Sequence, residues 1–130
     1  MKTKRVAVAI VRDENDNILF GIRNDNGLYT NPSGHLNVGE DPYEGVLREL
    51  KEETGLDGHD AKLVRVGFKA NKKILVYIFD VKVDKSQQID PSKDPDKECE
   101  IWAYLDPNDI LDQLHVPLQE NWGLEYWCNN

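Results

Sequence analysis

Residues 41–56 constrain the fold more than any other part of the chain, because they carry both a start and a stop signal for a helix. Asp41 can cap a first helical turn, and the proline that follows it is favoured at the first helical position. Gly55 stands where a left-handed C-cap would end the last turn. Between these signals, apolar residues recur at the spacing of one helix face: Tyr43, Val46, Leu47 and Leu50. We therefore expect an amphipathic helix that is held to a core along this stripe.

A second face of the expected helix is acidic. Glu49, Glu52 and Glu53 fall within an arc of about 100°. Like charges so close repel one another unless a cation lies between them, and ligands that are all oxygens favour Mg2+ or Mn2+. The alternative is a solvated face with an i,i+4 pair between Arg48 and Glu52. Gly45 lies on the same arc, where a side chain would obstruct a ligand, and it favours the metal site.

A longer pattern surrounds this helix. Gly34 is followed after five residues by Glu40, and after seven more by a run of defined positions: Arg48, Glu49, Leu50, Glu52, Glu53, Gly55 and Leu56. The pattern resembles the signature sequence of the Nudix hydrolases, and all nine defining positions match. The resemblance implies the α/β class and a Nudix-type α/β/α sandwich with a mixed β-sheet. It also implies Mg2+-dependent hydrolysis of a nucleoside diphosphate linked to another group, with Mn2+ expected to substitute.

The resemblance implies roles for individual residues of this segment. Glu49, Glu52 and Glu53 are expected to ligate the metal, with Glu49 and Glu53 as the principal ligands. The carbonyl of Ser33 is expected to join them, although the family commonly has glycine at that position. Arg48 is expected to orient the carboxylates through its bidentate guanidinium group. The expected catalytic residues of the segment are therefore Arg48, Glu49 and Glu52.

Further site residues are expected around the helix. Family members often recruit a glutamate from the loop before a late strand, and Glu98 and Glu100 are both candidates. Strand alternation places the two on one face, so we prefer Glu98 as the catalytic residue only because it lies nearer the loop. The alternative is that both are ordinary glutamates at a strand edge. Substrate contacts are expected from Arg23, Gly34 and Glu40, although Glu40 alternatively braces the loop before the helix, tethers a metal-bound water or complements the helix dipole.

Composition limits the possible partners. The net charge of −8 and a pI near 4.8 argue against a nucleic-acid polymer or an anionic membrane. A small nucleotide is compatible with this charge, because a bound metal supplies local positive charge. The length fits one domain, residues 1–130, as a monomer or homodimer. Two cysteines without ligand spacing and the lack of a membrane-spanning segment predict a cytoplasmic protein.

Apolar and β-branched runs predict five strands: residues 6–12, 17–23, 61–70, 74–83 and 99–105. The first two are expected to form a hairpin, and the next two to be joined by a short turn at Asn71-Lys72. Residues 24–33 and 84–97 are expected to be loops, and a polar loop as long as the second is usually functional or disordered. A second, short helix is expected from Asp106-Pro107 to Leu114.

Aromatic residues late in the chain allow two interpretations. Trp102 is expected to pack in the core. The aromatic residues of the tail either stack a nucleobase or, as is more usual, cover a core or a dimer seam: Trp122, Tyr126 and Trp127.

These observations favour an active hydrolase, most simply one that converts a nucleoside triphosphate to the monophosphate and pyrophosphate. ADP-ribose, a dinucleoside polyphosphate or a nucleotide-sugar are alternative substrates. A non-catalytic nucleotide-binding module is a further alternative, but such modules lose the carboxylates that this chain keeps. A structural calcium-binding domain fits least, since no looped carboxylate pattern is present in the sequence.

Overall fold

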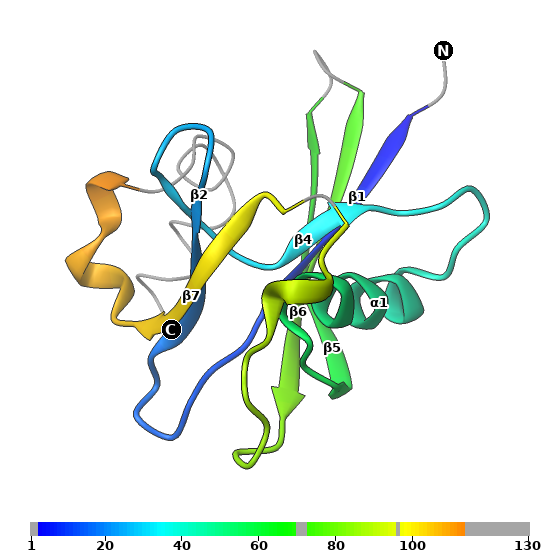
Figure 1. The fold of residues 1–130 in the computed structure, drawn as a ribbon. Helices are drawn as coiled ribbons and strands as arrows, with labels where there is room; N and C mark the ends of the chain where they lie inside the picture. Colours follow the sequence, from blue (N-terminus) through cyan, green and yellow to red (C-terminus); the bar gives the residue numbers. More distant parts are fainter. Residues whose placement is uncertain (1–2, 70–72, 96, 114–130) are drawn as a thin grey trace.

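Two β-sheets and one α-helix make up the described part of the chain, which comprises residues 3–69, 73–95 and 97–113 of a computed structural model (Figure 1). The four-stranded sheet has the order β4-β1-β6-β5, and the three-stranded sheet has the order β3-β2-β7. The first sheet contains β1 (Lys4–Ile10), β4 (Ser33–His35), β5 (Gly58–Lys69) and β6 (Ile74–Val83). The second contains β2 (Ile18–Arg23), β3 (Tyr29–Thr30) and β7 (Cys99–Leu105).

The four-stranded sheet is mixed. β1 runs parallel to β6, with Lys4 opposite Ile74 and Ile10 opposite Asp80, whereas β1–β4 and β5–β6 are antiparallel. β1 lies in the middle of the molecule, and its residues from Ala7 onward are buried on both faces. This continuous apolar run is typical of a strand that is covered on both sides.

Those two faces belong to two hydrophobic clusters. One fills the space between the sheets, where Val8, Ile10, Val76 and Ile78 meet Ile18 and Phe20 of β2. The other lies under α1 (Pro42–Thr54), where Ala7, Ala9 and Phe79 meet Val46 and Leu50 of the helix. The helix is thus fixed to the same strand that supports β4 (Figure 1).

The expected helix is confirmed at both ends. The Asp41 side chain accepts a hydrogen bond from the Tyr43 amide at 3.1 Å, and Pro42 opens the first turn. Gly55 ends the helix with a left-handed φ of 76°, and its amide donates to the Lys51 carbonyl. Val46 and Leu50 of the expected apolar stripe are fully buried.

The expected hairpin of residues 6–12 and 17–23 is right only at its closed end. The Asp13 amide donates to the Asn17 carbonyl, and Arg12 and Ile18 form an isolated antiparallel bridge. Beyond that bridge the strands separate, since β1 pairs with β4 and β6, while β2 pairs with β3 and β7. Two apolar strands joined by a turn predict a pairing, but burial of both faces of β1 draws them into different sheets.

Other expectations also needed correction. The expected loop 24–33 contains β3 and the start of β4, strands too short to leave a pattern in the sequence. β5 begins at Gly58 and not at residue 61, because register shifts and a positive φ at Asp60 interrupt its alternation. The expected ends of β6 and β7 are confirmed. The turn at Asn71-Lys72 lies largely outside the described residues.

The expected second helix is two 3-10 turns over the described residues, Pro107–Asp109 and Leu111–Gln113. Asp106 caps the first of them, but the chain does not continue into α-helix before residue 113. Leu114 and the aromatic tail lie outside the described residues. Within the described ranges, none of the helices has the length and apolarity that crossing a bilayer requires.

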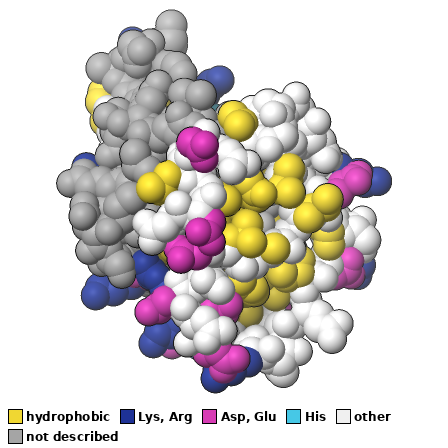
Figure 2. Space-filling model, turned by 90° about the vertical axis from the view of Figure 1, so that its left-hand side faces the viewer, with side chains coloured by type: hydrophobic (Ala, Val, Ile, Leu, Met, Phe, Trp, Pro, Cys, Tyr) yellow, Lys and Arg dark blue, Asp and Glu magenta, His cyan; other side chains and the backbone are white. Residues whose placement is uncertain are grey.

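Some large hydrophobic side chains are open to solvent, including Val66, Phe68 and Ile101, which are 46%, 56% and 61% exposed. Figure 2 shows hydrophobic side chains gathered across the middle of one face, with acidic side chains beside them. Apolar surface and negative charge therefore share this face of the molecule.

Candidate active site

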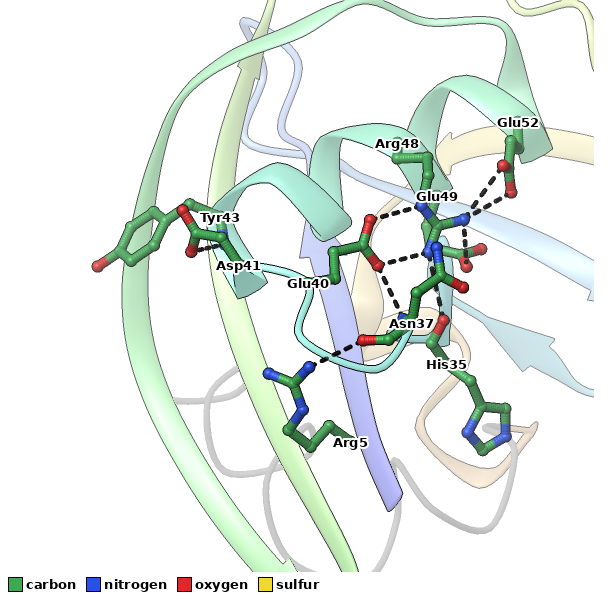
Figure 3. Close-up of polar contacts among 9 residues, drawn as sticks. All are labelled: Arg5, His35, Asn37, Glu40, Asp41, Tyr43, Arg48, Glu49 and Glu52. Carbon is green, nitrogen blue, oxygen red and sulfur yellow. Dashed lines mark hydrogen bonds and ion pairs between the residues drawn. The ribbon is translucent and has the colours of Figure 1, made fainter. Parts of the chain in front are cut away.

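Arg48 is the centre of a polar network on the exposed side of α1 (Figure 3). Its Nε and Nη2 donate to the two oxygens of Glu40 at 2.8 and 2.9 Å. Its Nη1 lies 3.1 Å from oxygens of both Glu49 and Glu52, and Nη2 also donates to the His35 carbonyl at 3.3 Å. One guanidinium group thus joins the helix to the loop before it and to β4.

Glu40 holds this loop in place. Besides Arg48, it accepts a hydrogen bond from the Asn37 amide at 2.9 Å, and the Asn37 carbonyl in turn accepts one from Arg5 of β1 at 2.9 Å. The hydrogen bonds from Arg48 are the main reason that the pKa of Glu40 is lowered to about 2, while the same contacts raise the pKa of Arg48. The geometry matches the bracing role among the alternatives for Glu40.

Two glycines permit close contacts inside this network. A Cβ atom at Gly34 would overlap the carboxyl group of Glu49, so glycine is required for that side chain to lie over β4. A Cβ at Gly45 would overlap the side chain of Leu36 and approach Glu40. The expectation that Gly45 keeps space clear for a ligand is therefore wrong, because Leu36 occupies that space.

Glu53 lies on the inner side of the carboxylate arc and is only 6% exposed. One of its oxygens accepts a hydrogen bond from the Ser33 amide at 2.7 Å. Burial raises the pKa of Glu53 to about 9. The hydrogen bond from Ser33 acts in the opposite direction and lowers this pKa, whereas the nearby carboxylates raise it further: Glu49, Asp94 and Glu98. Carboxylates of the helix and of the loop between β6 and β7 thus lie near one buried group.

Ser33 takes the place of the commoner glycine without backbone strain. It lies in β4 opposite Val8 and is not among the described residues with positive φ. Its backbone conformation is therefore one that serine adopts readily, and its carbonyl oxygen is available on the strand next to Glu53.

The loop between β6 and β7 supplies the other side of the site. Its 3-10 turn, Pro91–Lys93, is followed by Asp94, which is only 3% exposed. After burial, the charges of Asp94 and Glu98 both contribute to the raised pKa of Glu53, so the two carboxylates lie near it. Glu98 itself is half-exposed and lies 3.8 Å from Nη1 of Arg23.

Hydrogen bonds attach this loop to the end of α1 and to the residues that follow it. The Asp90 amide donates to the Thr54 carbonyl at 2.7 Å. The Gln87 side chain accepts from the Asp57 amide at 2.6 Å and donates to the Asp57 carbonyl at 2.9 Å. These contacts fix the position of the loop that carries Asp94.

Arg23 stands at the edge of the site on β2. Two hydrogen bonds to Asp25, at 2.9 and 2.7 Å, hold its guanidinium group and raise its pKa. Glu98 adds a weaker electrostatic contribution. Arg23 therefore keeps a fixed positive charge beside the carboxylates.

The two candidate glutamates of the late strand differ in their surroundings. Glu98 contributes to the pKa shifts of Glu53, Arg23 and Cys99, whereas Glu100 is exposed and contributes to none of these. A β-bulge explains the difference: Ile22 pairs with Ile101, but Arg23 pairs with Cys99, so Glu100 is the extra residue. Simple alternation, from which both glutamates were expected on one face, does not hold here.

The donor set fits a hard divalent cation. Carboxylate oxygens of Glu49 and Glu53 and the carbonyl oxygen of Ser33 are the ligand types that Mg2+ and Mn2+ prefer. In this arrangement Arg48 contacts Glu49 and Glu52, and the Ser33 amide contacts Glu53. In the described ranges, no three acidic, histidine or cysteine side chains are grouped so that they could hold a metal ion by themselves. The pKa of Glu53 is raised first by burial and then by nearby carboxylates, and a cation would relieve the repulsion from these carboxylates.

Sequence reasoning missed Asp94 and Gln87. Asp94 is one of several acids in the segment 84–98, and its local pattern does not distinguish it from the exposed ones. The available signal was Asp90-Pro91, which marks the turn that precedes it. No local signal pointed to the contact between Gln87 and Asp57, because these residues lie far apart in the sequence.

Comparisons with known proteins concern the family and the fold. The model of the NUDIX domain matches residues 1–125. An 8-oxo-dGTP diphosphatase of Escherichia coli (strain K12) is 38% identical over 60 residues, which cover 43% of this chain and 46% of that protein. The chain thus spans about half the length of this curated relative.

Solved structures share the fold. A MutT protein from Methanosarcina mazei Go1 superposes with a TM-score of 0.72 at 23% identity, covering 98% of this chain and 94% of that one. An ADP-ribose pyrophosphatase from Streptococcus suis 89-1591 superposes with a TM-score of 0.68 at 22% identity, covering 98% and 90%. At these identities the likeness concerns the fold.

Proposed function

Because the chain belongs to the Nudix hydrolase family, we propose that it hydrolyses a nucleoside triphosphate to the monophosphate and pyrophosphate with the help of Mg2+. The observation that carries the proposal is the concentration of Glu49, Asp94 and Glu98 around buried Glu53, next to a half-buried network around Arg48. The curated relative that acts as an 8-oxo-dGTP diphosphatase supports a triphosphate substrate.

We assign the roles as follows. Glu49 and Glu53 hold the divalent ion together with the Ser33 carbonyl, and Glu52 either joins them or holds a water bound to the ion. When bound, the ion neutralises charge on the phosphate oxygens and lowers the pKa of water. Arg48 orients Glu49 and Glu52 through its guanidinium group, and Glu40 keeps Arg48 in position.

The remaining residues act on water and substrate. Glu98 accepts the proton of the attacking water, whose oxygen forms a bond to phosphorus while the anhydride bond breaks and pyrophosphate leaves. Arg23 contacts a phosphate with its fixed positive charge, which Asp25 holds in place. Gly34 lets the Glu49 carboxylate and the substrate approach the backbone of β4.

We further propose that residues 1–130 act as one domain, in the cytoplasm, as a monomer or homodimer. The net charge of −8 supports a small nucleotide as the substrate, in preference to a nucleic-acid polymer or a membrane surface.

A panel assay tests the proposal. Purified protein is incubated with Mg2+ and nucleoside triphosphates, ADP-ribose, dinucleoside polyphosphates and nucleotide-sugars, and phosphate and pyrophosphate are measured separately. Release of pyrophosphate from triphosphates is the expected result. A preference for ADP-ribose would show that the proposed substrate is wrong and the proposed reaction class is right. A lack of hydrolysis of every compound in the panel would favour the non-catalytic binding module.

A further inference from the structure

Trp102 packs against the hydrophobic cluster under α1, as expected of a core residue, but it is only partly buried. It pairs with Gly21 of β2, and a Cβ at Gly21 would come within 2.8–2.9 Å of three atoms of the indole ring. The ring therefore lies against the backbone of β2, where any other residue would displace it.

The ring is also held at the end of β7 that follows Glu98. The indole Nε1 donates to the carbonyl of Cys99, three residues back along β7, at 3.2 Å. Cys99 directly follows Glu98 and pairs with Arg23 of β2. Burial and then the charge of Glu53 raise the pKa of its thiol to about 12. The hydrogen bond thus fixes the orientation of the indole ring at the end of β7 that adjoins Glu53.

The register of β2 and β7 places a cation on the same face as this ring. Residues that pair across antiparallel strands point to the same side, so Gly21 with Trp102 and Arg23 with Cys99 share one face of the three-stranded sheet. Ile22 and Ile101 point to the opposite face. A fixed guanidinium group and a partly open indole therefore lie side by side, next to the concentrated carboxylates.

We propose that the indole of Trp102 is the surface on which the nucleobase of the substrate stacks, with Arg23 beside it facing the phosphates. The inference rests on the proposed function, since it names the part of the same site that holds the base. Stacking on an aromatic ring tolerates every base, because each has a π-face. Trp102 therefore supplies affinity for a nucleotide over a base-free polyphosphate without selecting one base.

Binding measurements test this inference separately from catalysis. Dissociation constants of dGTP and of inorganic tripolyphosphate are measured by calorimetry with Ca2+, which is expected to support binding with little turnover. Trp102→Leu should weaken dGTP roughly tenfold, the fold-change expected for loss of one stacked base, and tripolyphosphate less than twofold. Trp102→Phe should retain most of the affinity. Ile101→Ala, on the same strand but the opposite face, is the matched control and should change neither constant.

A fluorescence measurement covers the case in which Trp102→Leu does not fold. In a Trp122→Phe, Trp127→Phe variant, Trp102 is the single tryptophan, and dGTP should quench its emission while tripolyphosphate should not. Equal weakening of both ligands in Trp102→Leu, unchanged dGTP binding, or lack of quenching by dGTP would overturn the inference. Pyrophosphate release in the panel assay decides the proposed function independently of these results.

Discussion

Glu53 lies in a position where its own negative charge is unfavourable. It is 6% exposed, faces the carboxylates of Glu49, Asp94 and Glu98, and receives one hydrogen bond from Ser33. Burial with like charges favours the protonated form and raises its pKa to about 9. The residue is suited to a site that receives a cation, and without one its charge opposes folding.

Glu53→Gln is therefore expected to raise the stability of the metal-free protein while it lowers the catalytic rate. The folded-state pKa lies above the unfolded value of 4.5, so the folded protein binds more protons between these values and loses stability as pH rises through that window. In chelator, the variant should match wild type near pH 4.5 and exceed it by about 2 kcal/mol at pH 8 in urea unfolding. With Mg2+, kcat should fall at least about a hundredfold.

The control for this experiment is Glu52→Gln, because the Glu52 side chain is 40% exposed. Its stability should not gain with rising pH. If Glu53→Gln keeps near-normal turnover, the assigned metal-ligand role of Glu53 is wrong.

Glu40 has the opposite linkage. Its pKa is lowered to about 2, chiefly by Arg48, so its ionised form contributes stability above the unfolded value of 4.5 that is lost as pH falls towards 2. Glu40→Gln should lower the free energy of unfolding by about 1–2 kcal/mol at pH 7, and the difference should shrink below pH 4. Glu44→Gln, at an exposed position in the first turn of α1, is the control. An equal loss of unfolding free energy in this variant would attribute the loss in Glu40→Gln to the helix dipole and not to Arg48.

At the scale of elements, the loop between β6 and β7 joins two parts of the site. Gln87 and Asp90 attach it to the end of α1, and Asp94 and Glu98 then lie near Glu53. Gly55 contributes to this contact, since a Cβ there would come within 2.8 Å of the Asp90 carbonyl oxygen. The glycine that ends the helix thus also lets the loop approach.

Glu98→Gln is expected to lower kcat by about tenfold to a thousandfold with little change in KM, as for loss of a general base. Glu100→Gln should do markedly less, because the bulge turns Glu100 away from Arg23 and Cys99. Both variants are compared at saturating Mg2+. A larger loss in Glu100→Gln would reverse the assignment, and a normal rate in both would leave catalysis to the helix and Asp94.

Local signals explain which elements were predictable. The ends of α1 follow from Asp41 and Gly55, whose capping contacts lie within the helix itself. The bulge opposite Arg23 and the short strand β3 depend on a partner strand far away in the sequence, so their own residues carry no sign of them. In the same way, the arc of glutamates was visible in the sequence, but the burial of Asp94 beside it was not.

At the scale of the whole molecule, the net charge of −8 makes local neutralisation necessary before an anionic substrate can bind. Hydrolysis should therefore stop in excess chelator and recover with Mg2+ or Mn2+, while Ca2+ supports it poorly, because the octahedral geometry of the smaller ions positions water. Turnover is measured after metal is returned to chelated protein. Full activity in chelator would contradict the assigned metal site.

The division of β1 and β2 between two sheets also belongs to this scale. The two strands are adjacent in sequence, and only the complete set of neighbours shows that β1 needs β4 on one side and β6 on the other. Pattern reasoning recovered the strands but not this arrangement. A hairpin partner pairs with one edge of β1, whereas its two faces are covered by α1 and by the second sheet.

The parallel pairing of β1 with β6 has a consequence for synthesis on the ribosome. β1 is translated before β6, and their pairing can be complete only when Asp80, opposite Ile10, has been made. Until then one edge of an apolar strand is open, and the sheet beneath α1 is incomplete. The glutamates of α1 are therefore made before the sheet that supports the helix is complete. A chaperone that shields apolar strands would act in this interval.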